Sequence, residues 1–185
     1  EQPFTGERYY ADGERSWYSG PDGERQNQVR DCGSLENAIL FTTSPHLFKD
    51  WEVERFQAVQ DKVKLFRYGV DCYAYCLLAA GHVDLVIETV LKPYDVGALI
   101  PIIEQAGGII TTWDGGRPEA GGSIIAAGSK AVHAEAMEML RRRAPYDRDK
   151  FQRQRDRLVK ESEMGTLFKV LGMCGRRWPF GVGFD

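Results

Sequence analysis

The sequence predicts an α/β protein in which a layered sheet is flanked by helices. Strand-like and helix-like segments alternate from residue 38 to residue 142, which is the pattern of layered α/β domains. The 185 residues suit about one domain, and they are 43% hydrophobic and 28% charged, a balance that argues against intrinsic disorder. We therefore expect one domain over residues 1–142, followed by a helical or irregular basic extension over 143–185.

The first 34 residues predict an antiparallel start to a sheet. Residues 8–11 and 16–18 are strand-like, and the dipeptides Asp12-Gly13 and Asp22-Gly23 are typical of turns between strands. A continuous apolar strand is expected at 38–43.

Helix signals begin at Asp50, which is a suitable N-cap for the apolar spacing that follows it. Pro93 suits the first turn of a helix that we expect to run to about Ala106, where two glycines end it. The other expected elements are a strand at 63–66, a buried helix that ends at Gly81, strands at 83–88, 109–113 and 124–127, and a helix at 130–142.

The net charge and the hydropathy of the sequence limit the classes of partner that we expect. The net charge of −3 argues against a nucleic-acid binder, and no apolar run reaches the roughly 18 residues that span a membrane. Residues 141–160 contain nine Lys or Arg and three Asp or Glu. We interpret this run as a solvated helical extension, with nucleic-acid or membrane-surface binding as the lesser alternative because acidic residues interrupt it.

The four cysteines predict free thiols rather than a metal site. None belongs to a CxxC pair, and the three histidines are scattered. Cys72 and Cys76 are four residues apart in an apolar stretch, so they could share one buried helix face. This usage favours a cytoplasmic location. The chain begins at Glu1 rather than at a methionine, which suggests that the natural start lies elsewhere.

The segment from Glu88 to Gly108 carries the main chemical signal. Glu88 ends an expected strand, and Asp95 lies in the first turn of the next expected helix. Carboxylates so placed lie at the usual ligand edge of an α/β sheet, and a helix N-terminus favours the ionised form that Mg²⁺ requires. From the spacing alone, a capping role for Asp95 is the better interpretation.

The whole segment resembles the carboxy-terminal signature of the inositol monophosphatase superfamily. That signature is Trp-Asp, small residues, an apolar helix and Glu-Ala-Gly-Gly. Here Tyr94 replaces the Trp, and the Glu-Ala pair reads Glu104-Gln105-Ala106. The resemblance covers roughly residues 1–142 and implies an αβαβα sandwich. Residues 41–48 together with 68–75 are closer to the bacterial histidinol-phosphatase branch.

The resemblance implies Mg²⁺-dependent hydrolysis of a small phosphomonoester, in which a metal-bound water attacks the phosphate. By position, Asp95 matches a metal ligand, and Glu88 matches a contact to the substrate hydroxyl. Gly69 and Asp71 match the loop beside the non-phosphate part of the substrate, and Ser44 lies in a second loop near that pocket. We also expect a homodimer in the complete enzyme.

Some of these assignments have structural alternatives. A helix N-cap is an equally good interpretation of Asp71. For Ser44 and Lys92, an exposed loop position is the better interpretation, and Thr43 accompanies Ser44 in its loop.

The amino-terminal metal motifs of the family are absent from this sequence. A paired-glutamate segment and Asp-Pro-x-Asp-Gly-Thr do not occur, and no Gly-x-x-Asp precedes residue 81, so no catalytic residue is assigned and Asp95 stands as the only family metal ligand. One carboxylate does not hold Mg²⁺ usefully. The chain therefore matches the second half of such an enzyme.

Histidinol phosphate is the expected substrate, since Asp71 and Glu88 would suit its cationic alcohol. The alternatives are an inositol-phosphate phosphatase, a nucleotide 3′-phosphate phosphatase, or a non-catalytic truncated remnant.

Overall fold

A computed structural model describes residues 1–141, and the extension predicted over 143–185 lies outside the described residues. The chain first forms a three-stranded antiparallel sheet, in the order β1 (Arg8–Ala11), β2 (Ser16–Gly20) and β3 (Gly23–Gln26). Asp12 closes the first turn by accepting the backbone N–H groups of Glu14 and Arg15 at 2.8 and 2.7 Å. These bonds lower the pKa of Asp12 to about 2. The predicted strands at 8–11 and 16–18 are confirmed.

A second, five-stranded mixed sheet follows, in the order β5-β4-β6-β8-β7. Strand β4 runs parallel to β5 and β6, whereas β8 is antiparallel to β6 and β7. The carboxyl ends of β4, β5 and β6 therefore meet at one edge. The bounds of the five strands are β4 Ile39–Thr42, β5 Leu65–Tyr68, β6 Leu85–Leu91, β7 Ile109–Thr112 and β8 Gly122–Ala127.

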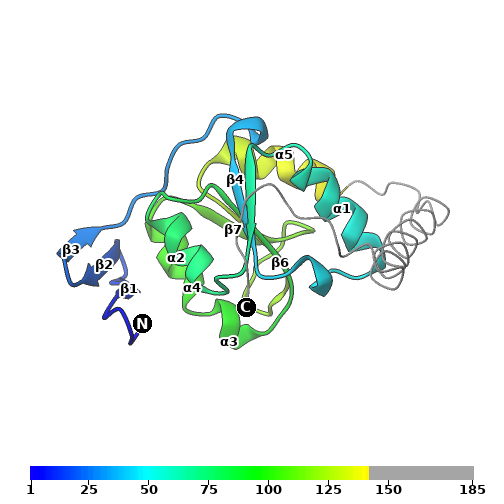
Figure 1. The fold of residues 1–185 in the computed structure, drawn as a ribbon. Helices are drawn as coiled ribbons and strands as arrows, with labels where there is room; N and C mark the ends of the chain where they lie inside the picture. Colours follow the sequence, from blue (N-terminus) through cyan, green and yellow to red (C-terminus); the bar gives the residue numbers. More distant parts are fainter. Residues whose placement is uncertain (142–185) are drawn as a thin grey trace, which may run out of the picture. The chain divides into compact units, whose positions relative to one another are not determined.

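Helices cover both faces of this sheet (Figure 1). The helices α1 (Asp50–Gln60) and α5 (Lys130–Arg141) pack on one face, and α2 (Tyr73–Ala79) and α4 (Leu99–Gln105) pack on the other. The second pair also contacts the three-stranded sheet, where Tyr9 and Ala11 pack against Ile102 and its neighbours. Four layers thus alternate as sheet, helices, sheet and helices, which confirms the predicted layered α/β fold.

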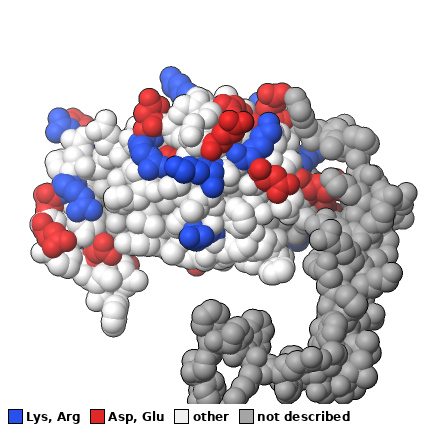
Figure 2. Space-filling model, turned by 45° about the horizontal axis from the view of Figure 1, so that its top comes forward, with Lys and Arg blue, Asp and Glu red and all other residues white. Residues whose placement is uncertain are grey.

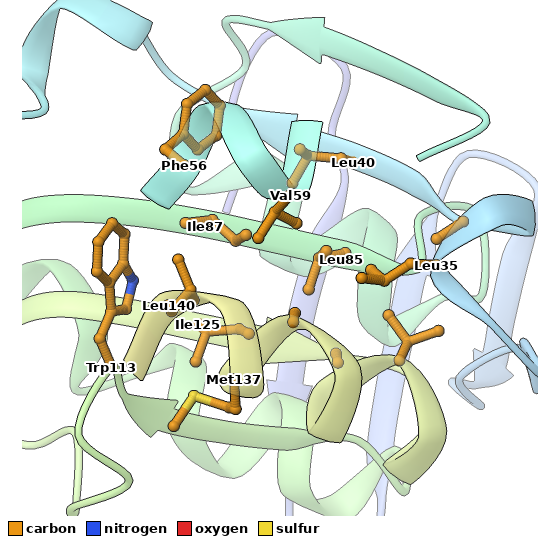
Figure 3. Packing of buried hydrophobic residues seen from close by; sticks show 14 of the residues in the cluster. Leu35, Leu40, Phe56, Val59, Leu85, Ile87, Trp113, Ile125, Met137 and Leu140 are labelled. Carbon is orange, nitrogen blue, oxygen red and sulfur yellow. The ribbon is translucent and has the colours of Figure 1, made fainter. Parts of the chain in front are cut away.

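The central strand β6 is apolar toward both helical layers. Leu85 and Ile87 join the cluster shown in Figure 3, with Phe56 from α1 and Leu140 from α5, while Val86 joins the opposite cluster. Successive strand residues point to opposite faces, so both faces of β6 are buried. Each such aliphatic side chain contributes roughly 1.5–3 kcal/mol when it is fully buried.

Some local predictions were wrong. The N-cap of α1 is Lys49 rather than Asp50, which lies in the first turn of the helix. The helix expected from Pro93 to Ala106 is divided into α3 (Pro93–Val96) and α4, because Pro101 cannot donate a hydrogen bond to the carbonyl of Gly97 and its ring crowds that carbonyl.

Cys72 is exposed rather than buried, because it precedes the first turn of α2. Cys32, Cys72 and Cys76 are free thiols, as predicted.

The described surface is mixed in charge. On the face shown in Figure 2, acidic and basic side chains are interleaved along one side of the molecule, and the rest is largely uncharged. Among residues 1–141, no helix combines the length and the apolar character that crossing a membrane requires.

A fully buried carboxylate at the start of the central strand ties three segments together. Asp84 accepts hydrogen bonds from the guanidinium of Arg30, including one from Nε at 3.0 Å, and its Oδ2 accepts the backbone N–H of Ile39 at 2.8 Å. Asp84 thereby fixes the linker that follows the three-stranded sheet against the start of β4.

We expect Asp84→Ala to lower the free energy of unfolding by about 2–4 kcal/mol, because Arg30 and the Ile39 N–H lose their acceptor. Urea denaturation monitored by circular dichroism measures this loss. The neighbouring Asp31→Ala removes an exposed carboxylate and should change stability by no more than about 0.5 kcal/mol. Equal midpoints for the two variants would contradict the assignment.

Candidate functional site

The candidate site is built where β4, β5 and β6 end together. The backbone N–H of Gly69 donates to the carbonyl oxygens of both Thr42 and Thr43, each at 3.0 Å, and so holds the end of β5 against the end of β4. Gly69 has φ +102°, a conformation that favours glycine over residues with a side chain. The loop that begins at Gly69 leads directly to Asp71.

Glu88 is a buried carboxylate on β6, with an exposed fraction of 4%. Its Oε1 accepts the backbone N–H of Thr43 at 2.9 Å and also the Thr43 hydroxyl, and its Oε2 accepts the Tyr75 hydroxyl at 3.2 Å. Burial raises the pKa of Glu88, and these hydrogen bonds partly oppose that effect. A carboxylate offers about four lone-pair positions. Three donors occupy Glu88, so it has room for one more.

Asp71 is exposed, and residues 1–141 provide no hydrogen-bond or ion-pair partner for its side chain. The N-cap of α2 is Cys72, and no side chain caps that helix, so the alternative of Asp71 as a helix cap was wrong. The Asp71 charge contributes to the raised pKa of Glu88. Its carboxylate is therefore free to meet a ligand.

Asp71 follows β5, Glu88 lies on β6 and Asp95 follows β6, and we call the edge of the sheet that carries these three carboxylates the acidic edge. The hydroxyl of Tyr75 donates to Glu88 at this edge. Burial is the main cause of its raised pKa, and the charges of Glu88, Asp71 and Asp95 raise it further, in that order. Of the three carboxylates, Glu88 is the one that contacts the Tyr75 hydroxyl. The sequence did not identify Tyr75, because it lies in an apolar helical run where a core aromatic would look the same.

Asp95 is exposed and caps the short helix α3. Its Oδ2 accepts the backbone N–H of Lys92 at 2.7 Å, so the capping role favoured from spacing is present. This bond engages one carboxylate oxygen. Lys92 and Tyr94, its neighbours in the sequence, are exposed, and Tyr94 is 82% accessible.

Ser44 and Thr43 differ in what they contact. The Ser44 hydroxyl accepts the backbone N–H of His46 at 3.3 Å, which is a local turn contact. Thr43 instead gives both of its donors to Glu88. Of the two, Thr43 is the residue that shapes the site.

The described residues do not fit a complete magnesium site. Within residues 1–141 no group of three or more His, Cys, Asp or Glu side chains could hold a metal ion. Asp95 offers one oxygen that its capping bond leaves open. Because Mg²⁺ dehydrates reluctantly and requires several oxygen ligands, this carboxylate could serve only as one part of a shared site.

Comparison with known proteins identifies the family. The inositol monophosphatase family pattern matches residues 1–144. The chain belongs to this family.

Individual relatives agree with that assignment. The chain is 47% identical over 150 residues to the "Bifunctional phosphatase IMPL2, chloroplastic" of Arabidopsis thaliana. This match covers 76% of this chain and 42% of the relative. It is 30% identical over 141 residues to a histidinol-phosphatase of Mycobacterium tuberculosis, covering 75% of this chain and 54% of the relative. The chain thus spans about half the length of the curated relatives it matches.

A solved structure of an inositol monophosphatase from Zymomonas mobilis is similar in fold. It has a TM-score of 0.61 and 37% identity, and the match covers 68% of this chain and 53% of that chain. The layered fold inferred from the resemblance is therefore confirmed by a structure as well as by sequence.

The raised pKa of Glu88 predicts a pH-dependent stability. Its pKa in the folded protein lies above the ordinary 4.5, so the folded state holds the proton longer, and the stability it provides is lost as pH rises from 4.5 through the higher folded pKa. Glu88→Gln removes this loss. We expect the melting temperature of the Gln variant, relative to the parent chain, to rise across that interval.

Thermal unfolding at steps from about pH 4 to pH 8 checks this expectation, and Glu14→Gln provides an exposed control. A constant difference between Glu88→Gln and the parent chain at every pH would show that the Glu88 carboxyl titrates normally.

Proposed function

We propose that this chain supplies the carboxy-terminal half of a Mg²⁺-dependent phosphomonoester phosphatase whose substrate is histidinol phosphate. The observation that carries the proposal is the placement of Asp71 after β5, Glu88 on β6 and Asp95 after β6, at one edge of the sheet, in a member of the inositol monophosphatase family. The similarity to a histidinol-phosphatase at 30% identity supports the choice of substrate.

Asp95 is the proposed metal ligand in this half. One of its oxygens caps α3 and the other remains open, so the cap would fix the carboxylate while it binds an ion. The remaining ligands would come from an amino-terminal half; the match covers only 42% and 54% of the two relatives, so they are long enough to contain one. Bound Mg²⁺ would supply the positive charge that polarises a phosphate ester.

Asp71 is the proposed partner of the histidinol amine or imidazolium. It is exposed and unpartnered within the described chain, whereas Glu88 has room for only one further donor. Gly69 and Ser44 would border the same alcohol pocket. A positive group is attracted to such an acidic edge more strongly than it would be in bulk water.

The other assignments have narrower support. The similarity to the Zymomonas mobilis enzyme at 37% identity favours inositol phosphate as the second candidate substrate, and a nucleotide 3′-phosphate remains a further alternative. The incomplete metal site favours a non-catalytic remnant as the candidate from another class. A homodimer is proposed for the complete enzyme. The cytoplasmic location stays a prediction, and the Arabidopsis relative is named as chloroplastic.

A chimera tests the proposed activity. The 185-residue chain is joined behind the amino-terminal half of the Arabidopsis relative, and phosphate release is measured with and without Mg²⁺. We expect Mg²⁺-dependent turnover by the chimera and none by the chain alone, because the chain alone lacks most metal ligands. Asp95→Asn should reduce the turnover at least about 100-fold, since even the loss of an outer partner of a metal site costs up to that much.

Asp114→Asn is the matched control, because Asp114 is exposed and bonds to Thr112 and its neighbours rather than to the acidic edge. If the 185-residue chain alone turned over at about 1 per second, a rate ordinary for enzymes, the half-enzyme proposal would be wrong.

Asp71→Asn tests the substrate. In the chimera, we expect the ratio of kcat/KM for histidinol phosphate to kcat/KM for glycerol 2-phosphate to fall roughly 10- to 100-fold, because a charge-assisted hydrogen bond worth about 1.5–3 kcal/mol is removed for only one substrate. The phosphate contribution cancels in this ratio. Glu88→Gln should lower the ratio as well. An unchanged ratio would reject histidinol and leave the broader phosphatase proposal.

A further inference from the structure

Another buried carboxylate, that of Glu52 in α1, lies on the face of β6 that α1 covers. Glu52 has an exposed fraction of 5%. Its Oε1 accepts the hydroxyls of Thr89, at 2.9 Å, and Ser123, while its Oε2 accepts the backbone N–H of Lys49 and the same Thr89 hydroxyl, each at 3.1 Å. No Lys, Arg or His side chain within the described residues forms an ion pair with it.

Thr89 connects this carboxylate to the site. Thr89 follows Glu88 directly on β6, and adjacent strand residues point to opposite faces. Glu88 accordingly meets Thr43 and Tyr75 on one side, while Thr89 meets Glu52 on the other. Glu52 thus holds the central strand at the residue beside Glu88 without reaching the ligand edge itself.

Strand β6 is irregular directly after Glu88. Glu88 pairs with Ile124 and Leu91 pairs with Gly122, so three steps along β6 match two steps along β8, which is a β-bulge. Val90 within the bulge has φ +56°, a conformation that β-branched residues rarely adopt, and its side chain is exposed. Such a conformation persists only where surrounding contacts impose it.

Beyond the bulge, the chain continues through Lys92 to Asp95. The position of the bulge therefore sets the direction in which Asp95 leaves the strand relative to Glu88. Thr89 is the bulge residue whose side chain is anchored in the interior, and Glu52 is its anchor.

We propose that Glu52 is a positioning residue: through Thr89 it fixes the β-bulge at 89–90 and thereby the relative placement of Glu88 and Asp95. The relevance of this placement to catalysis rests on the proposed function. A buried carboxylate without a counter-ion is a poor means of adding stability. Its hydrogen bonds to α1, β6 and β8 instead fix the geometry of three elements, as satisfied buried polar networks do.

Two substitutions separate positioning from stability in the 185-residue chain. Thr89→Val removes the bulge hydroxyl that donates to the Glu52 carboxylate. Ser129→Ala is the control, because it removes a buried hydroxyl that donates to the backbone carbonyl of Cys32, away from the bulge. NMR follows the titration of the Glu88 carboxyl carbon and of the Thr43 amide, and hydrogen exchange follows the backbone amides of residues 90–95 other than Pro93. Melting curves of both variants record their stability.

We expect Thr89→Val to shift the Glu88 titration and to speed exchange at 90–95 about tenfold, the equivalent of one lost hydrogen bond. Ser129→Ala should leave both signals as in the parent chain although its melting temperature falls. Thr89→Ser keeps the hydroxyl and should restore both signals. Equal changes in Thr89→Val and Ser129→Ala, or no change in either, would overturn the proposal.

If Thr89→Val does not fold, Glu52→Asp takes its place, because it shortens the side chain by one methylene and moves the carboxylate away from the Thr89 hydroxyl. The same two signals are then measured and decide the outcome. None of these measurements requires turnover. An inactive chimera would therefore reject the phosphatase proposal without altering what the titration says about Glu52.

Discussion

The central strand β6 is covered by helices on both faces, so every polar side chain it carries must find a partner inside the protein. Asp84 is satisfied by Arg30 and the Ile39 N–H, Glu88 by Thr43 and Tyr75, and Thr89 by Glu52. Each of these bonds fixes a different segment: the linker after the first sheet, the loop after β4, and the start of α1. The arrangement of the candidate site therefore follows from the need to give each buried polar group along this strand a hydrogen-bond partner.

The sequence predicted the features that depend on local periodicity. The strand ending near Glu88 and the helical turn at Asp95 follow from apolar spacing and from Pro93, and the alternation of elements was enough for the fold class. The break before Pro101 was missed because the apolar pattern continues through it. The contacts of Glu88 with Tyr75 and of Thr89 with Glu52 join residues 13 and 37 positions apart, and no local pattern reports which faces of two elements meet.

Glu88 and Asp71 were assigned as a pair, and the structure distinguishes them. Glu88 is buried and already accepts three hydrogen bonds, so most of its bonding capacity maintains the meeting point of β4, β6 and α2. Asp71 is exposed with an unengaged carboxylate. We therefore expect a substitution at Glu88 to alter stability as well as the proposed ligand contact, whereas one at Asp71 should affect mainly the proposed contact.

The three carboxylates at the edge act on one another as well as on a ligand. Asp71 raises the pKa of Glu88, and all three raise the pKa of Tyr75, which is the response expected where negative charge accumulates in a partly dehydrated place. Burial is the main cause of both shifts, and a positive charge at this edge would oppose the part that the carboxylates add. The proposed metal ion and the proposed cationic substrate group would both supply such a charge. The added rise in the pKa of Tyr75 and the proposed binding of cations at this edge would thus both depend on the same three carboxylates.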